Sequence, residues 1–237
     1  MDNLGSAVRD LVIANRILVQ QGVLDAYGHV SVRHPEKPDR YLLASSRSPE
    51  LVEESDIAEY DLSSELIHRD GRKSYIERFI HGGIYEARPD VLAVIHSHAE
   101  DTLPFSITKE PLRAVLHNAS RIGSHVPVWD IRDAFGDTNM LVSNVAQGRD
   151  LARALAQNSV VLMRGHGFAT AGAKLREVVG LAVYLPKNAR VLLNALRFGE
   201  VNALSDGELE QIHHGPQPHD WKRAWEYWSR RAGFDER

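Results

Sequence analysis

The feature that most constrains the fold is an apolar run that ends in two histidines, VLAVIHSH at residues 91–98. Its apolar residues do not alternate with polar ones, which predicts a strand that is buried on both faces. Such a strand belongs inside a sheet that has helices on each side. Further strands are predicted by the segments HVSVRH, RYLLAS, IAEYDL and SVVLMRG, at residues 29–34, 40–45, 57–62 and 159–165.

Helices are predicted between these strands, because apolar residues recur there at helical spacing. The predicted helical segments are residues 4–22, 74–90, about 148–157 and 175–199. Pro186 falls inside the last segment and is expected to kink that helix or break its hydrogen bonding locally. Near the C-terminus, one helical face carries Trp221, Trp225 and Trp228, which we expect to pack against the domain or a neighbouring subunit. The pattern predicts one α/β domain over residues 1–237, with a mixed sheet and helices on its faces.

The composition excludes several classes of protein. A net charge of -4 and a pI near 6.3, without a Lys/Arg cluster, give no reason to expect binding to nucleic acid. No segment approaches the roughly 18 apolar residues that a membrane span needs. The chain has no cysteine, so disulfides, thiolate metal sites and cysteine nucleophiles are excluded. We expect a soluble protein that suits the reducing cytoplasm.

His96 and His98 lie two positions apart on the predicted strand, so their side chains share a face, about 6–7 Å apart along it. Two imidazoles in this arrangement can bind one metal ion, or they can be half-buried histidines with ordinary hydrogen bonds. A second apolar strand ends in Gly165-His166-Gly167. His166 offers the third protein ligand of a catalytic zinc-type site, which leaves a further position open for water or substrate.

Glu77 lies on the predicted helix just before the His-x-His strand, among apolar neighbours. A carboxylate in apolar surroundings near a metal is a candidate general acid or base. The alternative is an exposed helical glutamate that pairs with Arg78 or His81.

Together, Glu77, the His-x-His motif separated from it by 18 residues, and the Gly-His-Gly motif resemble the class II aldolase/adducin family. The resemblance covers nearly the whole chain and includes the segment YGHVSVR at residues 27–33. It implies a three-layer α/β/α domain with a central mixed, mainly antiparallel sheet. It also implies that His96, His98 and His166 are metal ligands and that Glu77 is the catalytic acid/base, able to approach the metal. Many members of the family are tetramers with active sites at subunit interfaces.

The chain departs from the family's sugar-phosphate aldolases at the positions that hold phosphate. Those enzymes use an asparagine, a Thr-Gly loop and a Ser-Ser pair, whereas this chain has His29, the loop Ser45-Ser46-Arg47-Ser48, and Tyr75 followed by Ile76. An aromatic and a branched aliphatic residue cannot supply the hydroxyl donors that a phosphate dianion needs. A phosphosugar substrate is therefore disfavoured.

The altered residues suit a planar carboxylic acid instead. Arg47 offers a guanidinium fork for a carboxylate, His29 adds a donor beside it, and Tyr75 with Ile76 forms an apolar wall. His117 is a further candidate substrate contact. The segments YIERFIHGGIYEARPD, HNAS and VPVWDIRDAFGD, at residues 75–90, 117–120 and 126–137, resemble the family branch that decarboxylates dihydroxyphthalates and carboxylated muconic semialdehydes in aromatic catabolism.

The resemblance predicts a carbon–carbon lyase that uses one divalent metal ion per subunit. Three imidazoles and a carboxylate accept zinc, our first expectation, and also Mn, Fe, Co or Ni. The expected partners are a small carboxylic acid and further copies of the chain, in a homo-oligomer and most simply a tetramer. The alternative is a metal-dependent aldolase that acts on an unphosphorylated hydroxy-oxo acid or sugar. A non-catalytic binding module, as in adducins, is disfavoured because all three histidines and Glu77 are present.

Overall fold

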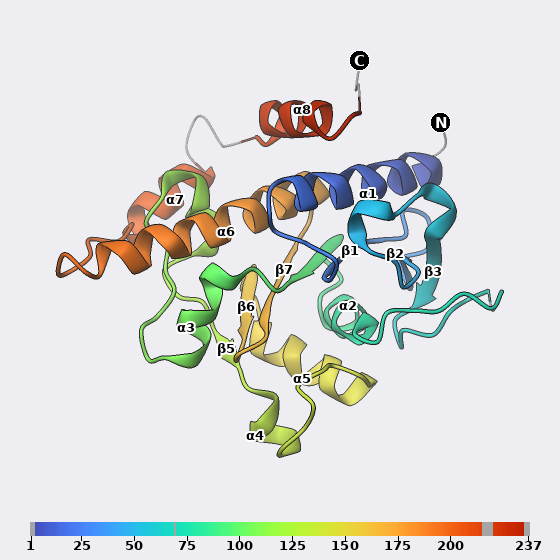
Figure 1. Cartoon of the computed structure of the whole chain (residues 1–237), viewed down its shortest axis with the longest axis horizontal. Helices are drawn as coiled ribbons and strands as arrows, with labels where there is room; N and C mark the ends of the chain where they lie inside the picture. Colours follow the sequence, from blue (N-terminus) through green and yellow to red (C-terminus); the bar gives the residue numbers. More distant parts are fainter. Residues whose placement is uncertain (1–2, 69, 215–219, 235–237) are drawn as a thin grey trace.

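The computed structural model describes residues 3–68, 70–214 and 220–234 (Figure 1). Within them lies a seven-stranded sheet with the strand order β3-β2-β1-β4-β7-β6-β5. The strands are β1 (His29–Arg33), β2 (Arg40–Ala44), β3 (Ile57–Asp61), β4 (Ala93–Ser97), β5 (Val128–Trp129), β6 (Val160–Met163) and β7 (Gly167–Gly172). The α-helices are α1 (Asn3–Gln20), α2 (Arg78–Ala87), α3 (Leu103–Ile107), α4 (Ile131–Phe135), α5 (Val145–Leu155), α6 (Leu175–Ala195), α7 (Asp206–His214) and α8 (Lys222–Arg231).

The sheet is mixed and mainly antiparallel, as the sequence predicted. All neighbouring strands pair antiparallel except β5 and β6, which are parallel. The strand predicted from the run at residues 91–98 is β4, which lies at the centre between β1 and β7 and has all five of its residues buried.

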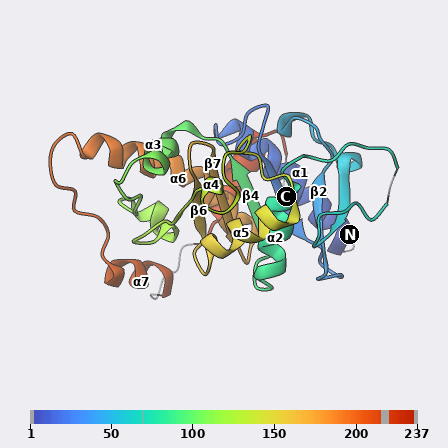
Figure 2. The same cartoon turned by 90° about the horizontal axis from the view of Figure 1, so that it is seen from below.

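The helices form two layers on opposite faces of the sheet, which gives the three-layer α/β/α architecture (Figure 1). Helices α1, α6 and α8 pack together on one face, and α2 and α5 lie side by side on the other (Figure 2). Alternate residues of β4 serve the two cores: Ala93 and Ile95 pack on the side of α1 and α6, and Val94 packs on the side of α2 and α5. Among the described helices, none has the length and apolar character needed to cross a membrane.

Helix α2 starts later than the predicted segment at residues 74–90. It begins at Arg78, and Glu77 stands at its N-cap outside the helical region. Tertiary hydrogen bonds hold the preceding residues in place: the Arg78 guanidinium donates to the carbonyls of Ser64 and Tyr75, and the Tyr75 hydroxyl donates to the carbonyl of Arg47. These contacts outweigh the local helical preference, and Glu77 is therefore free to turn its carboxylate away from the helix axis.

Helix α6 continues through Pro186 to Ala195, so the proline does not end the helix. Proline removes one amide donor, and burial of this helix against the sheet and α1 holds its two halves together. The three tryptophans pack against their own chain: Trp221, Trp225 and Trp228 are all buried in the core that includes α1 and α6.

Close packing of α2 on α5 depends on glycine. A Cβ atom on Gly83 would collide with the backbone of Gly148, and one on Gly148 would collide with the carbonyl of Phe79. The backbones of the two helices are therefore in direct contact, and this contact sets the height of the α2 N-terminus above the sheet.

We predict that Gly83→Ala lowers the free energy of unfolding by about 1–3 kcal/mol, because two helix backbones must move apart to admit one methyl group. Gly207→Ala in α7 is the control, since its Cβ would come no closer than 3.9 Å to the Ser205 hydroxyl. Urea denaturation followed by circular dichroism measures both variants. Equal midpoints for the two would contradict the packing argument.

Candidate metal centre

Four side chains meet at one end of the central strands. The carboxylate of Glu77 and the imidazoles of His96, His98 and His166 each contribute one ligand atom, and these atoms lie within 4.8 Å of one another. The Nε2 atom of His98 is 2.9 Å from that of His96 and 3.1 Å from that of His166. The Glu77 Oε2 atom is 3.4 Å from the Nε2 atoms of both His96 and His166.

Strand pairing brings the two histidine motifs together. His96 pairs with Ala169 across β4 and β7, so the tight turn that holds His166 lies beside the end of β4. Gly165 has a φ of 62° in this turn, a conformation that favours glycine. At Gly167 a side chain would collide with the Ser97 carbonyl, so this glycine permits contact between the two strands.

Backbone carbonyls set the orientation of two of the imidazoles. His96 Nδ1 lies 3.0 Å from the carbonyl oxygen of Phe168, and His166 Nδ1 lies 3.0 Å from that of Met140. A carbonyl can only accept, so each Nδ1 carries the proton, and in the neutral ring each Nε2 has a free lone pair. Such contacts are the usual outer partners of metal-binding histidines.

The donor set fits a divalent cation. Two nitrogen atoms bound about 2.0–2.1 Å from one zinc ion lie about 2.8–3.4 Å apart for angles at the metal between roughly 90° and the tetrahedral value, and the observed Nε2 spacings of 2.9 and 3.1 Å fall in this range. Without a cation, lone pairs and a carboxylate at such distances would repel one another. This cluster can therefore hold a metal ion with three nitrogen ligands and one oxygen ligand.

Glu77 is buried, and both oxygen atoms of its carboxylate have partners. Its Oε1 atom accepts a hydrogen bond of 3.0 Å from the Val142 amide, and its Oε2 atom faces His96 and His166. Burial raises the pKa of Glu77, but the two imidazoles outweigh this effect and hold the pKa well below its usual range. Burial, together with His96 and His166, lowers the pKa of His98 to about 4. The alternative reading of Glu77, as an exposed residue paired with a helical neighbour, does not describe this carboxylate.

A cavity of about 340 Å³ opens onto the cluster. Its wall includes the predicted substrate contacts His29, Ser46, Arg47 and Tyr75, along with Ile76, Glu77 and His98. The Arg47 guanidinium has a partner within the chain, because its Nη1 atom lies 3.2–3.3 Å from the carboxylate of Asp56. Its Nε and Nη2 atoms have no hydrogen-bond partner among the described residues.

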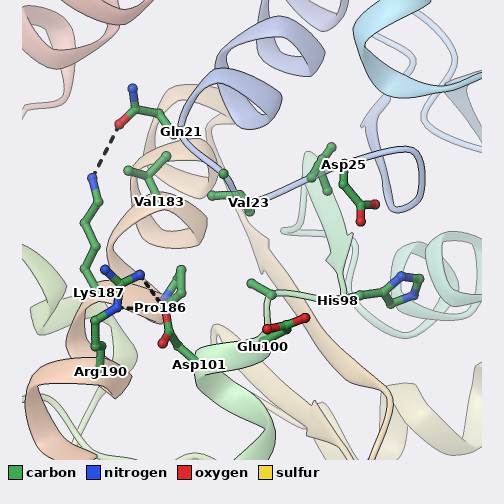
Figure 3. A pocket seen from close by; sticks show the side chains of 13 residues that line it. Gln21, Val23, Asp25, His98, Glu100, Asp101, Val183, Pro186, Lys187 and Arg190 are labelled. Carbon is green, nitrogen blue, oxygen red and sulfur yellow. Dashed lines mark hydrogen bonds and ion pairs between the residues drawn. The ribbon is translucent and has the colours of Figure 1, made fainter. Parts of the chain in front are cut away.

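A second cavity, of about 470 Å³, lies between α6, residues 21–25 and the segment that follows β4 (Figure 3). His98 lies at one end of it, and Lys187 and Arg190 lie at the other. Both cations already have partners: Lys187 contacts the Gln21 amide oxygen, and Arg190 pairs with Asp101.

Two predicted substrate contacts do not line the cavity next to Glu77. Ser45 is held by a backbone hydrogen bond from its amide to the Asp56 carbonyl, and only its neighbours Ser46, Arg47 and Ser48 reach the cavity wall. His117 begins a 3-10 helix and lines a separate cavity with Leu204 and Ile212. Within one chain, the structure does not bring His117 to the histidine cluster.

Sequence reasoning missed two parts of the site. The loop before α5 supplies the Met140 carbonyl and the Val142 amide, and backbone groups leave no residue-type signal in a sequence. His81 was considered only as a possible partner of Glu77. Instead, its Nε2 atom lies 2.6 Å from Nδ1 of His29. Its spacing of four residues from Glu77 on an amphipathic helix could have indicated that it faces the same side of the sheet.

Residues 9–193 match the sequence pattern of the class II aldolase and adducin N-terminal domain. The chain belongs to this family. Among its relatives, the decarboxylase tropJ of Talaromyces stipitatus is 33% identical over 94% of this chain and 92% of its own length. The 3,4-dihydroxyphthalate decarboxylase of Arthrobacter keyseri is 25% identical over 85% of this chain and 84% of its own.

The fold of this class II aldolase family member is confirmed by solved structures. An L-fuculose 1-phosphate aldolase from Glaciozyma antarctica superposes with a TM-score of 0.74 at 22% identity, over 97% of this chain and 87% of the other. The sequence relatives also confirm the predicted likeness to decarboxylases within the family.

We predict that His98→Ala weakens zinc binding at least about 100-fold, because one of three imidazole donors is removed. Isothermal titration of the metal-free protein with Zn²⁺ measures the affinity, and circular dichroism checks that the variant is folded. His117→Ala, in the separate cavity, serves as the control and should bind zinc as the unaltered protein does. Equal affinities for the two variants would mean that the cluster is not the metal site.

Proposed function

We propose that this protein is a divalent-metal-dependent carboxy-lyase that acts on an aromatic or unsaturated carboxylic acid of aromatic catabolism, such as a dihydroxyphthalate or a ring-fission product. The observation that carries the proposal is the make-up of the 340 Å³ cavity, where Tyr75 and Ile76 provide a flat apolar wall and Arg47 provides one guanidinium, next to Glu77. The likeness to two decarboxylases over most of the chain supports it.

In the proposed complex, the substrate lies with its ring or double bond against Tyr75 and Ile76. The Nε and Nη2 atoms of Arg47 form one edge of the guanidinium and donate in parallel to a carboxylate. Asp56 holds the opposite side of the guanidinium, which limits the rotamer freedom of Arg47 and keeps that edge directed to the substrate. His29 donates to a second oxygen.

Glu77, His96, His98 and His166 would hold the metal ion, which supplies Lewis-acid withdrawal of electron density from a substrate oxygen next to the reacting carbon. The bond between that carbon and its carboxylate breaks, CO₂ leaves, and the electron pair stays on the carbon. Glu77 is ionised, so it holds and orients a water that delivers a proton to this carbon, and the hydroxide that remains takes up a proton from solvent, which balances the reaction. The apolar cavity wall excludes other water and strengthens each of these electrostatic contacts.

We further propose zinc as the resident ion, with Mn, Fe, Co or Ni as alternatives, since imidazole-rich sites accept each of them. We propose a homotetramer, in which exposed apolar side chains such as Phe198 and Ile107 would be covered by neighbouring copies. The absence of cysteine from the chain suits a cytoplasmic location.

An aldolase for an unphosphorylated hydroxy-oxo acid is the second candidate, because aldol cleavage needs the same electron withdrawal and Arg47 would bind its carboxylate equally well. This chain shares its fold with an L-fuculose 1-phosphate aldolase, which is consistent with the aldolase candidate. Product analysis separates the two: CO₂ without a second carbon fragment indicates a carboxy-lyase, and pyruvate or an aldehyde indicates an aldolase.

We predict that the zinc-loaded protein releases CO₂ from 3,4-dihydroxyphthalate or a related catechol carboxylate, and that Glu77→Gln lowers kcat by about 10²–10⁴-fold because proton delivery is lost. Infrared detection of CO₂ with liquid chromatography of the organic product measures turnover, and metal analysis verifies that the variant retains zinc. Wild-type turnover by Glu77→Gln would remove this residue from the mechanism.

We predict that Arg47→Lys lowers kcat/KM for a dicarboxylic substrate about 10- to 100-fold, because a bidentate contact to a carboxylate in a shielded cavity contributes about 1.5–3 kcal/mol. Zinc content should not change. The matched control is Arg72→Lys, because Arg72 makes a similar exposed pair with Asp70 away from the cavity. If both variants have the kinetics of the parent protein, Arg47 does not bind the carboxylate.

A further inference from the structure

A chain of buried hydrogen bonds runs from α2 to the cavity through a histidine that the proposed reaction does not use. His81 is fully buried, one turn along α2 from Glu77. Its Nε2 atom lies 2.6 Å from Nδ1 of His29, and its Nδ1 atom lies 2.6 Å from the Ser31 hydroxyl. The Ser31 hydroxyl is in turn 2.9 Å from the hydroxyl of Tyr85, which is also buried. Four polar groups thus form one line, with His29 at its outer end.

The protons in this line have one consistent direction. Among the described residues, the Ser31 hydroxyl is the one hydrogen-bond acceptor for the buried Tyr85 hydroxyl, so the opposite direction would leave the phenol proton without a partner. The phenol proton is therefore available to Ser31, and the Ser31 proton points to Nδ1 of His81. His81 then carries its proton on Nε2 and donates it to Nδ1 of His29. Because Nδ1 of His29 accepts this hydrogen bond, the proton of the neutral His29 ring is on Nε2.

Burial supports this count because both rings are buried, His81 completely, and a charged imidazolium is costly away from water. Burial lowers the pKa of His81 to about 3, with a smaller contribution from His96. A neutral imidazole has one donor and one acceptor nitrogen. The hydrogen bond from His81 therefore determines which nitrogen of His29 is the donor.

The remaining nitrogen of His29 faces the cavity. His29 is part of the cavity wall with Arg47 and Tyr75, and its Nε2 atom has no hydrogen-bond partner among the described residues. We propose that Tyr85, Ser31 and His81 are positioning residues that hold His29 as the Nε2–H tautomer, so that the site presents a fixed hydrogen-bond donor to an oxygen of a carboxylate ligand. The identity of that ligand as the acid to be decarboxylated rests on the proposed function.

This arrangement has a consequence that simple core packing would not have. The His29 ring nitrogen would accept from some ligands and donate to others if its tautomer were unrestrained. A fixed donor favours carboxylate or carbonyl oxygen at this position and disfavours a hydroxyl that must donate. The hydrogen-bonded chain from Tyr85 to His29 thus favours acids over sugars by fixing a hydrogen-bond donor, whereas Arg47 favours acids by its charge.

Neutron diffraction from perdeuterated, zinc-loaded crystals tests the tautomer directly. We expect deuterium on Nε2 and none on Nδ1 in both His29 and His81. Deuterium on Nδ1 of His29 would overturn the proposal. Since no turnover is involved, this result stands or falls independently of whether the protein releases CO₂ from any acid.

Binding of phthalate, a dicarboxylate probe, to the zinc-loaded protein tests the role of the chain. Tyr85→Phe removes the hydroxyl that sets its direction, so we expect phthalate to bind about three- to tenfold more weakly as the competent tautomer becomes less populated. Tyr41→Phe is the matched control: Tyr41 is equally buried and its ring stacks near His81, but its hydroxyl donates to the Arg78 carbonyl. It should bind phthalate as the parent does.

A substitution at His81 gives a second measure. His81→Ala should weaken phthalate binding, and His81→Gln should restore part of it, because the glutamine amide can again donate to Nδ1 of His29. Zinc affinity should stay the same in every variant. The proposal fails if the Tyr85→Phe and Tyr41→Phe variants have the same affinity for phthalate. It also fails if the His81→Ala and His81→Gln variants have the same affinity for phthalate.

Discussion

The site depends on the pairing of β4 with β7. This one register places His96 opposite Ala169 and directs the Phe168 carbonyl at the His96 ring, while the turn before β7 carries His166. Contact between the strands is possible because Gly167 has no side chain to meet the Ser97 carbonyl. A shift of one residue would move His96 to the opposite face of the sheet and separate the two histidine motifs. The geometry of the candidate metal centre therefore depends on the sheet as much as on the four side chains that would bind the ion.

Charge would explain how the proposed metal centre recognises an acid. Three neutral imidazoles and one carboxylate around a divalent ion leave one net positive charge in a partly buried site. Arg47 adds a second at the cavity wall, although Asp56 offsets part of it. In the proposed enzyme, an anionic substrate would thus be favoured at both ends of the cavity, and the apolar wall between them would favour a flat molecule over a sugar.

The sequence predicted much of this because its strongest signals are local. The unbroken apolar run of β4, the histidines two positions apart and the glycines around His166 each depend on the geometry of a few consecutive residues. The start of α2 was not predictable in the same way, since the hydrogen bonds that hold Tyr75 and Arg78 come from residues distant in sequence. The Val142 amide and the Met140 carbonyl were invisible because every residue carries such groups. The contact of Gly167 with the neighbouring strand was not predictable either, because it depends on the register of β4 with β7.

The metal ligands and the cavity wall are held by different parts of the molecule. Strand pairing and carbonyl contacts orient His96 and His166, whereas Arg47 and Tyr75 belong to loops that are joined by the Tyr75 hydroxyl. Substitutions in those loops can change the shape and charge of the wall while the strands that carry the ligands stay in register. Within a lineage, new substrates can therefore arise through a few exchanges in the wall, with the metal chemistry inherited intact at each step.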